Sequence, residues 1–152
     1  MRRYNVLMDG IEQVSDRDGY QWRATRHIGE LLGATRIGAS VYELPQGQRT
    51  FPYHFHHGVE EWLYVVSGAP VLRTPEGERT LAPGDLCCFP SGSAGAHTLR
   101  GPGRMLIFSA NRAPSISVYP DSDKVAPRPE DQADPDRLNF RRGDAVGYWD
   151  GE

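Results

Sequence analysis

Three histidines and two glutamates lie within eight consecutive positions of one short segment, PYHFHHGVEEWLYVVSG, residues 52–68. Imidazole nitrogens and carboxylate oxygens together form a ligand set that suits a divalent transition metal. A further histidine follows in the segment CCFPSGSAGAHTLRG, so four of the five histidines of the chain fall between positions 54 and 97. The candidate ligands are His54, His56, His57, Glu60, Glu61 and His97.

The alternation of side chains along a strand separates the three neighbouring histidines. In an extended strand, residues i and i+2 face the same side, so His54 and His56 project together, as two ligands of one ion would. His57 faces the opposite side or begins the turn at Gly58. We therefore interpret His57 as a surface residue or as a residue behind the ligands.

A second strand begins close to the two glutamates. A short turn at residues 57–59 could fold this strand back beside the histidines, and alternation allows only one of Glu60 and Glu61 to face inward. If Glu61 faces inward, Leu63 and Val65 line the same interior, and the aromatic residues that alternate with them face outward. The strand period alone leaves both glutamates as candidates.

The elements around these residues are short strands separated by turns. Tight turns with glycine and proline occur at 75–77, 82–85 and 101–103, and no long stretch has the apolar period of a helix. This pattern is typical of an all-β sandwich or barrel. Proline and aspartate are frequent in residues 118–140, which we expect to be extended loop, and Tyr148 and Trp149 could anchor the tail to the body. The expected strands fall within residues 20–29, 34–44, 60–68, 71–74, 79–82, 86–90, 97–100 and 104–110.

Length and composition limit the class of protein. A chain of 152 residues predicts one domain, and a net charge of −3 disfavours binding to nucleic acid. No apolar run is long enough for a membrane span or a signal peptide. Adjacent strand residues such as Cys87 and Cys88 point to opposite faces and would not readily bridge each other, so we predict a reduced, cytoplasmic protein.

The first segment resembles a motif of the cupin superfamily, a group of proteins that fold as small β-barrels. The usual first cupin motif is G-x5-H-x-H-x3,4-E-x6-G. The matching residues are Gly47, His54, His56, Glu61 and Gly68, with one extra residue between the first glycine and the first histidine. The interval to Gly68 selects Glu61 over Glu60.

The second segment resembles the second cupin motif, G-x5-P-x-G-x2-H-x3-N. Gly84, Pro90 and Gly92 match it. His97 lies two residues further along than the motif has its histidine, because the four residues SAGA stand in place of a two-residue spacer. Gly101 stands where the asparagine is expected. The chain is most similar to single-domain cupins of the cupin_2 type, which implies an all-β double-stranded β-helix, or jelly-roll barrel, with an irregular N-terminal arm and an extended C-terminal tail.

The resemblance also implies a site and a division of the chain. Cupins of this kind hold one divalent ion on three histidines and one glutamate, here His54, His56, Glu61 and His97. The ion could be Zn, Mn, Fe, Ni, Co or Cu, because ligand type alone does not choose among them. We expect an N-terminal arm with added strand or strands at 1–34, the barrel core at 35–110, and at 111–152 a tail packed on the barrel or on a partner.

Two functions fit such a site. The first is a small-molecule enzyme of the isomerase, decarboxylase or dioxygenase type, and the second is a non-catalytic binding or sensing module. A polar, proton-transferring wall beside the ion would favour the enzyme. Arg36, Arg73 and Arg104 could bind an anionic ligand if they face inward. The resemblance also implies a homodimer, because single-domain cupins usually pair through their sheet edges, which need cover.

Overall fold

The architecture is all-β, as the sequence predicts, and is shown by a computed structural model that describes residues 1–110, 114–131 and 133–152. One short helix, α1 (Ile28–Leu32), and three 3-10 turns, η1 (Ser93–Gly95), η2 (Pro120–Ser122) and η3 (Arg142–Asp144), interrupt the strands. The strands are β1 (Gln13–Arg17), β2 (Tyr20–Thr25), β3 (Ile37–Leu44), β4 (Phe55–His57), β5 (Glu61–Gly68), β6 (Val71–Thr74), β7 (Gly77–Thr80), β8 (Leu86–Phe89), β9 (Thr98–Arg100), β10 (Gly103–Ala110), β11 (Ser115–Tyr119), β12 (Lys124–Arg128) and β13 (Phe140–Arg141).

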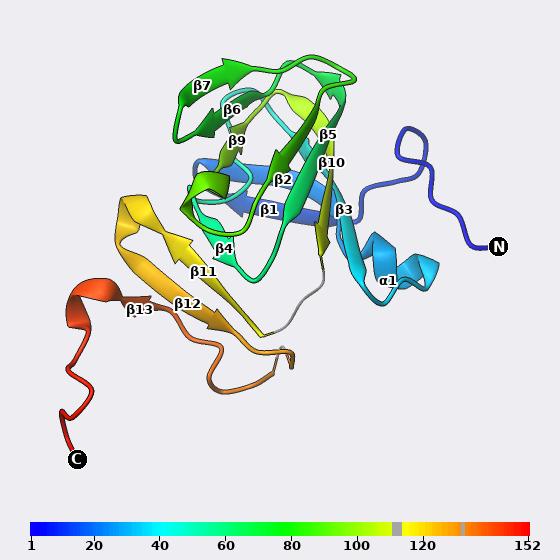
Figure 1. Ribbon diagram of the computed structural model, residues 1–152. Helices are drawn as coiled ribbons and strands as arrows, with labels where there is room; N and C mark the ends of the chain where they lie inside the picture. The colour runs from blue at the N-terminus through cyan, green and yellow to red at the C-terminus, as the bar shows by residue number, and fades with distance from the viewer. Residues whose placement is uncertain (111–113, 132) are drawn as a thin grey trace.

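The strands form three antiparallel sheets that enclose one core. The largest sheet has the order β1-β2-β3-β10-β5-β8, and the two smaller sheets have the orders β13-β12-β11-β4 and β7-β6-β9. The sheets curl around a common interior as a jelly-roll barrel (Figure 1). The interior is filled by apolar side chains from several strands, including Ala24, Leu63, Val65, Leu99 and Met105, each with no exposed surface.

Strand β5 shows how the sequence pattern becomes a wall of the barrel. Leu63 and Val65 are fully buried, whereas Trp62 and Tyr64 remain 39% and 38% exposed on the outer face. This is the alternation expected of a strand with one face on the core. Because Glu61 has the same parity as Leu63 and Val65, its side chain also points into the barrel.

The two flanking segments carry more strand than the sequence indicates. Strand β1 pairs with β2 in the N-terminal arm, and β2 continues the large sheet beside β3. The expectation of loop at 118–140 is wrong for the segment that forms β12, because β11 pairs with β4 on one side and with β12 on the other. Pro127 has no N–H to donate to a neighbouring strand. It does not prevent this pairing, because it lies near the end of β12.

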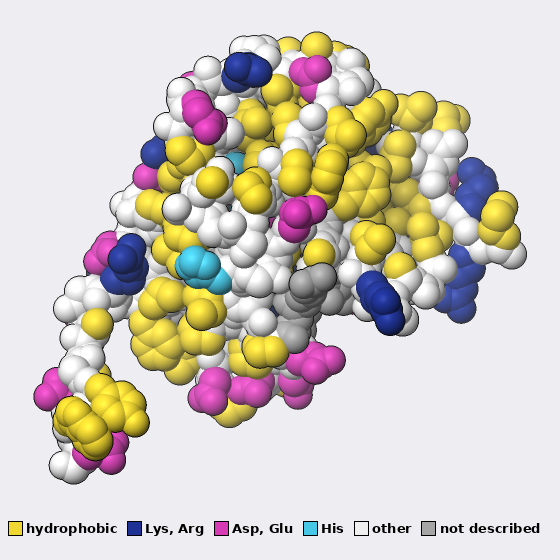
Figure 2. Space-filling model, in the orientation of Figure 1, with side chains coloured by type: hydrophobic (Ala, Val, Ile, Leu, Met, Phe, Trp, Pro, Cys, Tyr) yellow, Lys and Arg dark blue, Asp and Glu magenta, His cyan; other side chains and the backbone are white. Residues whose placement is uncertain are grey.

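The last residues stand apart from the barrel. Val146, Tyr148 and Trp149 are 76%, 86% and 77% exposed, and the two aromatic rings contact each other at a centroid distance of 4.8 Å. The expectation that these aromatic residues anchor the tail to the body of the same chain is therefore wrong. Figure 2 shows this segment projecting from the body, with hydrophobic side chains near its tip. None of the described helices has the length and apolar character needed to cross a membrane.

Candidate metal centre

Backbone pairing places two of the candidate histidines side by side. His54 and His97 form an isolated antiparallel bridge in which each N–H donates to the carbonyl of the other, at 3.1 Å and 2.8 Å. Residues directly opposite each other in such a bridge carry their side chains on the same face. The two imidazole rings accordingly lie 5.0 Å apart between centroids, although 43 positions separate them in sequence.

The other two candidates come from β4 and β5. His56 is the residue on β4 that pairs with Ser117 on β11, and its ring lies 4.8 Å from that of His54. Glu61 begins β5, where β8 and β10 flank it. The short turn between β4 and β5 brings its carboxylate to the imidazoles, as the sequence predicts for one of the two glutamates.

The donor atoms are spaced as the ligands of a single ion would be. The Nε2 atoms of His56 and His97 lie 3.2 Å and 3.5 Å from the same carboxylate oxygen of Glu61. Two ligands held tetrahedrally about 2.1 Å from one ion would be about 3.4 Å apart. One ligand atom from each of His54, His56 and Glu61 lies within 4.8 Å of the others, and this group of three could hold a metal. His97 adjoins the group through its contact with Glu61.

Hydrogen bonds fix which ring nitrogen is offered to the centre. The Nδ1 atoms of His54 and His97 each lie 2.9 Å from a backbone carbonyl, of Pro52 and of Gly95. A carbonyl only accepts hydrogen bonds, so Nδ1 carries the proton and Nε2 keeps its lone pair in the neutral ring. The Nδ1 atom of His56 lies 3.1 Å from the hydroxyl of Ser117. This is the arrangement that orients metal-binding histidines in proteins.

The electrostatic environment favours metal-binding protonation states of His54, His97 and Glu61. Burial and the neighbouring His97 and His56 lower the pKa of His54 to about 3, and burial also lowers the pKa of His97. Burial disfavours the ionised form of Glu61, but the hydrogen bond from His56 outweighs this and holds the pKa of the carboxyl below its usual value. Neutral imidazoles and an ionised carboxylate are the forms that bind metal ions.

Aromatic packing holds the imidazoles in place. The Phe89 ring stacks on that of His97 at 3.7 Å between centroids and 8° between planes, and the Tyr119 ring stacks on that of His54 at 5.8 Å. The longer spacer before His97 forms the turn η1, in which a side chain on Gly95 would come within 1.9 Å of the carbonyl oxygen of Pro90. The extra residues thus form a close-packed turn, and His97 still pairs with His54.

The cluster lies in the wall of a cavity of about 370 Å³, which is a volume typical of small-molecule sites. Its walls are mixed rather than purely apolar. Hydroxyl groups come from Tyr42 and Tyr119, and charged groups come from the two flanking segments. The polar and titratable residues that line the cavity, apart from the cluster, are Arg26, His27, Glu30, Ser40, Tyr42, Thr50, Ser109, Ser117, Tyr119 and Arg128.

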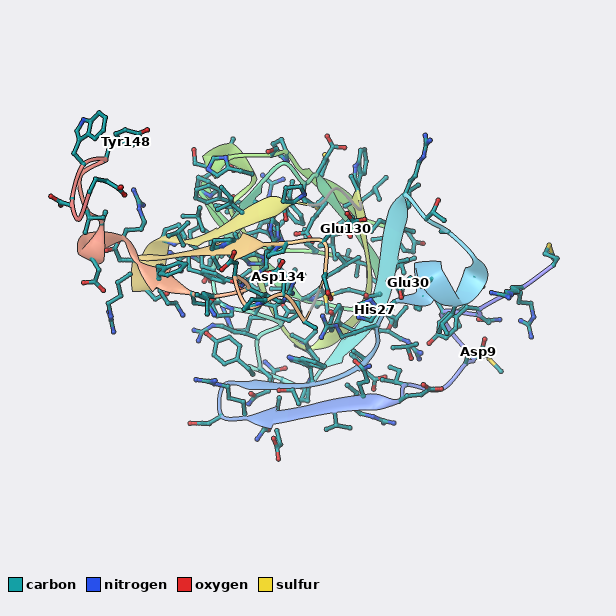
Figure 3. The ribbon with its side chains drawn as sticks, turned by 90° about the horizontal axis from the view of Figure 1, so that it is seen from below. Asp9, His27, Glu30, Glu130, Asp134 and Tyr148 are labelled. Carbon is teal, nitrogen blue, oxygen red and sulfur yellow. The ribbon has the colours of Figure 1, made fainter. Side chains whose placement is uncertain are left out.

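Several of these lining residues were not identified from the sequence. His27 and Glu30 lie side by side where β2 leads into α1, with 3.4 Å between Nδ1 and Oε1 (Figure 3). His27 has the left-handed backbone conformation, with φ of 60°, which is uncommon outside glycine. Spacing could not reveal these residues or Arg128, because they come from segments distant in sequence that meet only when the sheets close.

Other candidates lie elsewhere. His57 and Glu60 are exposed, and Glu60 accepts a hydrogen bond from the indole of Trp62 at 2.9 Å. Arg73 forms a bidentate pair with Asp121 outside this cavity. Arg104 donates hydrogen bonds to the carbonyls of Leu7 and Asp9, and so fastens the N-terminal arm to the barrel. Neither these arginines nor Arg36 lines the cavity.

Comparison with known proteins agrees with the geometry. A family model described as "Cupin domain" matches residues 40–110, which contain all four candidate ligands. Residues 40–110 of this chain therefore form a cupin domain. A structure named a sugar phosphate isomerase from a cupin superfamily, from Silicibacter pomeroyi, is 21% identical with a TM-score of 0.77, and 98% of each chain is covered.

Two other solved structures have lower TM-scores. The polyketide cyclase RemF from Streptomyces resistomycificus is 22% identical with a TM-score of 0.59, and the alignment covers 76% of this chain and 83% of the cyclase. A cupin-like protein from Thermotoga maritima is 17% identical with a TM-score of 0.55, covering 71% of this chain and 85% of its own. These similarities show a shared fold. A search of curated proteins gives no match.

Proposed function

We propose that this cupin holds one divalent transition metal on His54, His56, Glu61 and His97, and that it is an enzyme acting on a small molecule in the adjacent cavity. One observation carries the proposal: the Nε2 atoms of His56 and His97 contact one carboxylate oxygen of Glu61, and a ligand atom of His54 lies within 4.8 Å of His56 and Glu61. A separate partner holds Nδ1 of each of the three histidines. A metal bound there would act as a Lewis acid on an oxygen of the substrate, because a set of four protein ligands can leave coordination positions open.

The cavity wall supports an enzyme over a passive binding site. Tyr42 and Tyr119 offer hydroxyls, and His27 and Glu30 form a pair that can exchange a proton. Burial raises the pKa of Tyr42, which keeps its hydroxyl protonated as a hydrogen-bond donor. Isomerisation is the first of the three candidate reactions to test, since it requires proton transfer and the neighbour with a TM-score of 0.77 is named a sugar phosphate isomerase. A non-catalytic binding or sensing cupin is the alternative.

The metal site is tested by the metal content of the purified protein and its variants. We expect close to one transition-metal ion per chain, measured by mass spectrometry of the digested protein, and loss of that ion in His56→Ala, His97→Ala and Glu61→Ala. Glu60→Ala and His57→Ala are matched controls, one residue away on the outer face, and should keep the metal. Retention of the full metal content in the first three variants would refute the ligand assignment.

A further inference from the structure

The lining of the cavity carries positive charge that is not paired within the described part of the chain. The guanidinium of Arg128 donates only to neutral groups: the carbonyls of Pro127 and Leu138, the hydroxyl of Tyr119 and the side-chain oxygen of Asn139, at 3.1–3.4 Å. No ion pair joins Arg128 or Arg26 to a carboxylate of the described residues. Neutral acceptors fix the position of Arg128 without compensating its charge.

The two arginines reach the cavity from opposite ends of the sequence. Arg26 directly follows β2, and Arg128 ends β12. Both lie outside the matched cupin domain, yet both line the same cavity. The charged residues in the described lining are these two arginines, Glu30 and Glu61, with His27 beside Glu30. A divalent ion on the cluster would leave this cavity with about two net positive charges, in a chain whose formal charge is −3.

A single side chain links Arg128 to the metal cluster. The ring of Tyr119 stacks on His54 and its hydroxyl accepts a hydrogen bond from Arg128 at 3.1 Å. The distance from the cluster to the guanidinium is therefore about the length of one tyrosine side chain. Because the hydroxyl accepts from Arg128, its own hydrogen is free to be donated to a ligand. A compact molecule could contact the metal at one end and Arg128 at the other.

We propose that the ligand of this cavity is a small polar molecule with a terminal phosphate or carboxylate, and that Arg128 and Arg26 bind this anionic group while the metal binds oxygens at the opposite end. This inference rests on the proposed function, in that the cavity of the metal cluster is taken as the ligand site. Arg128 is the fixed contact, since four acceptors hold its side chain, whereas Arg26 is exposed and can adjust to the ligand.

The test compares three probes of similar size by isothermal titration calorimetry: ribose 5-phosphate, ribonate and ribose. We expect at least one anionic probe to bind at least about tenfold more tightly than ribose, since a charged hydrogen bond contributes about 1.5 kcal/mol or more. A preference for ribose 5-phosphate identifies the anion as phosphate, and a preference for ribonate identifies it as carboxylate. Equal affinity for all three probes would overturn the proposal.

Variants assign the effect to the arginines. In Arg128→Gln the preference for the anionic probe should fall to within about threefold of ribose, and in Arg26→Gln it should fall by a smaller factor. Arg79→Gln removes the same charge from β7, away from the cavity lining, and should bind like the wild type. If loss of the Arg128 hydrogen bonds prevents folding, as judged by circular dichroism, Arg26→Gln decides alone. An unchanged preference in Arg26→Gln and in any folded Arg128→Gln protein would refute the assignment.

Titration of metal-loaded and chelator-treated protein separates the two proposals. If the purified protein holds no metal but the arginine-dependent preference remains, the metal proposal fails and the anion site stands. If the protein holds its ion but shows no anionic preference, the anion site fails and the metal proposal stands.

Discussion

The cavity has two differently built regions, named here the base, which is the metal cluster, and the mouth, which holds Arg26 and Arg128. At the base, His54, His97 and Glu61 come from the matched cupin domain, are largely buried, and contact one another within hydrogen-bonding or ligand distance. At the mouth, Arg26 and Arg128 come from the two flanking segments and contact no carboxylate of the described residues. Under our two proposals, the matched cupin domain supplies the metal ligands, and the flanking segments supply the arginines that bind the anionic group of the ligand.

The difference in packing predicts a large difference in stability. Phe89 is 5% exposed and stacks on His97, so Phe89→Ala should lower the free energy of unfolding of the metal-free protein by about 3 kcal/mol through loss of buried surface and formation of a cavity. Arg26→Ala at the mouth should change it by less than about 0.5 kcal/mol. Urea unfolding followed by tryptophan fluorescence measures both values.

The same strand offers a control for this prediction. Leu86 lies on β8 with Phe89, but it is 59% exposed. Leu86→Ala should therefore cost much less than Phe89→Ala. Equal costs for the two variants would show that the base is not the rigid region that its packing indicates.

The hydrogen bond that orients the ligand His56 predicts an intermediate effect on metal binding. Ser117 is 2% exposed and its hydroxyl lies 3.1 Å from Nδ1 of His56, so Ser117→Ala should weaken metal binding by about tenfold without removing a ligand. Competition with a fluorescent zinc chelator measures the affinity. Ser122→Ala, an exposed serine in η2, should bind zinc like the wild type. An unchanged affinity in Ser117→Ala would mean that β11 contributes nothing to orienting the ligands.

The base could be predicted from the sequence because its geometry is mostly local. Strand period places His54 and His56 on one face, and the motif interval selects Glu61 over Glu60. His97 contacts Glu61, as expected from its place in the second cupin motif, although its role as a metal ligand stays a proposal. The extra spacer residues did not prevent this, because they form a turn rather than a shift in the strand.

The mouth could not be predicted in this way because its geometry is non-local. Tyr119 and Arg128 lie in a segment whose proline and aspartate content indicated loop, and their positions follow from the pairing of β11 with β4 and with β12. The arginines that the sequence did single out, Arg73 and Arg104, hold other parts of the fold together. Residue type alone does not show whether an arginine faces a partner or a cavity.

The smallest predicted effect is that of salt, which should weaken anion binding at the mouth and leave metal binding at the base unchanged. Ionic screening acts on exposed charges far more than on buried, directly coordinated ones. Raising sodium chloride from about 0.05 M to about 0.5 M should therefore weaken binding of the preferred anionic probe by about fivefold, because Arg26 is exposed at the mouth. Metal content measured at both salt concentrations should stay the same, since His54 and His97 are only 8% and 5% exposed. Ribose is the uncharged control and should bind equally at both concentrations. Loss of metal at high salt, or anion binding that ignores salt, would show that the two ends of the cavity do not differ in the way their burial indicates.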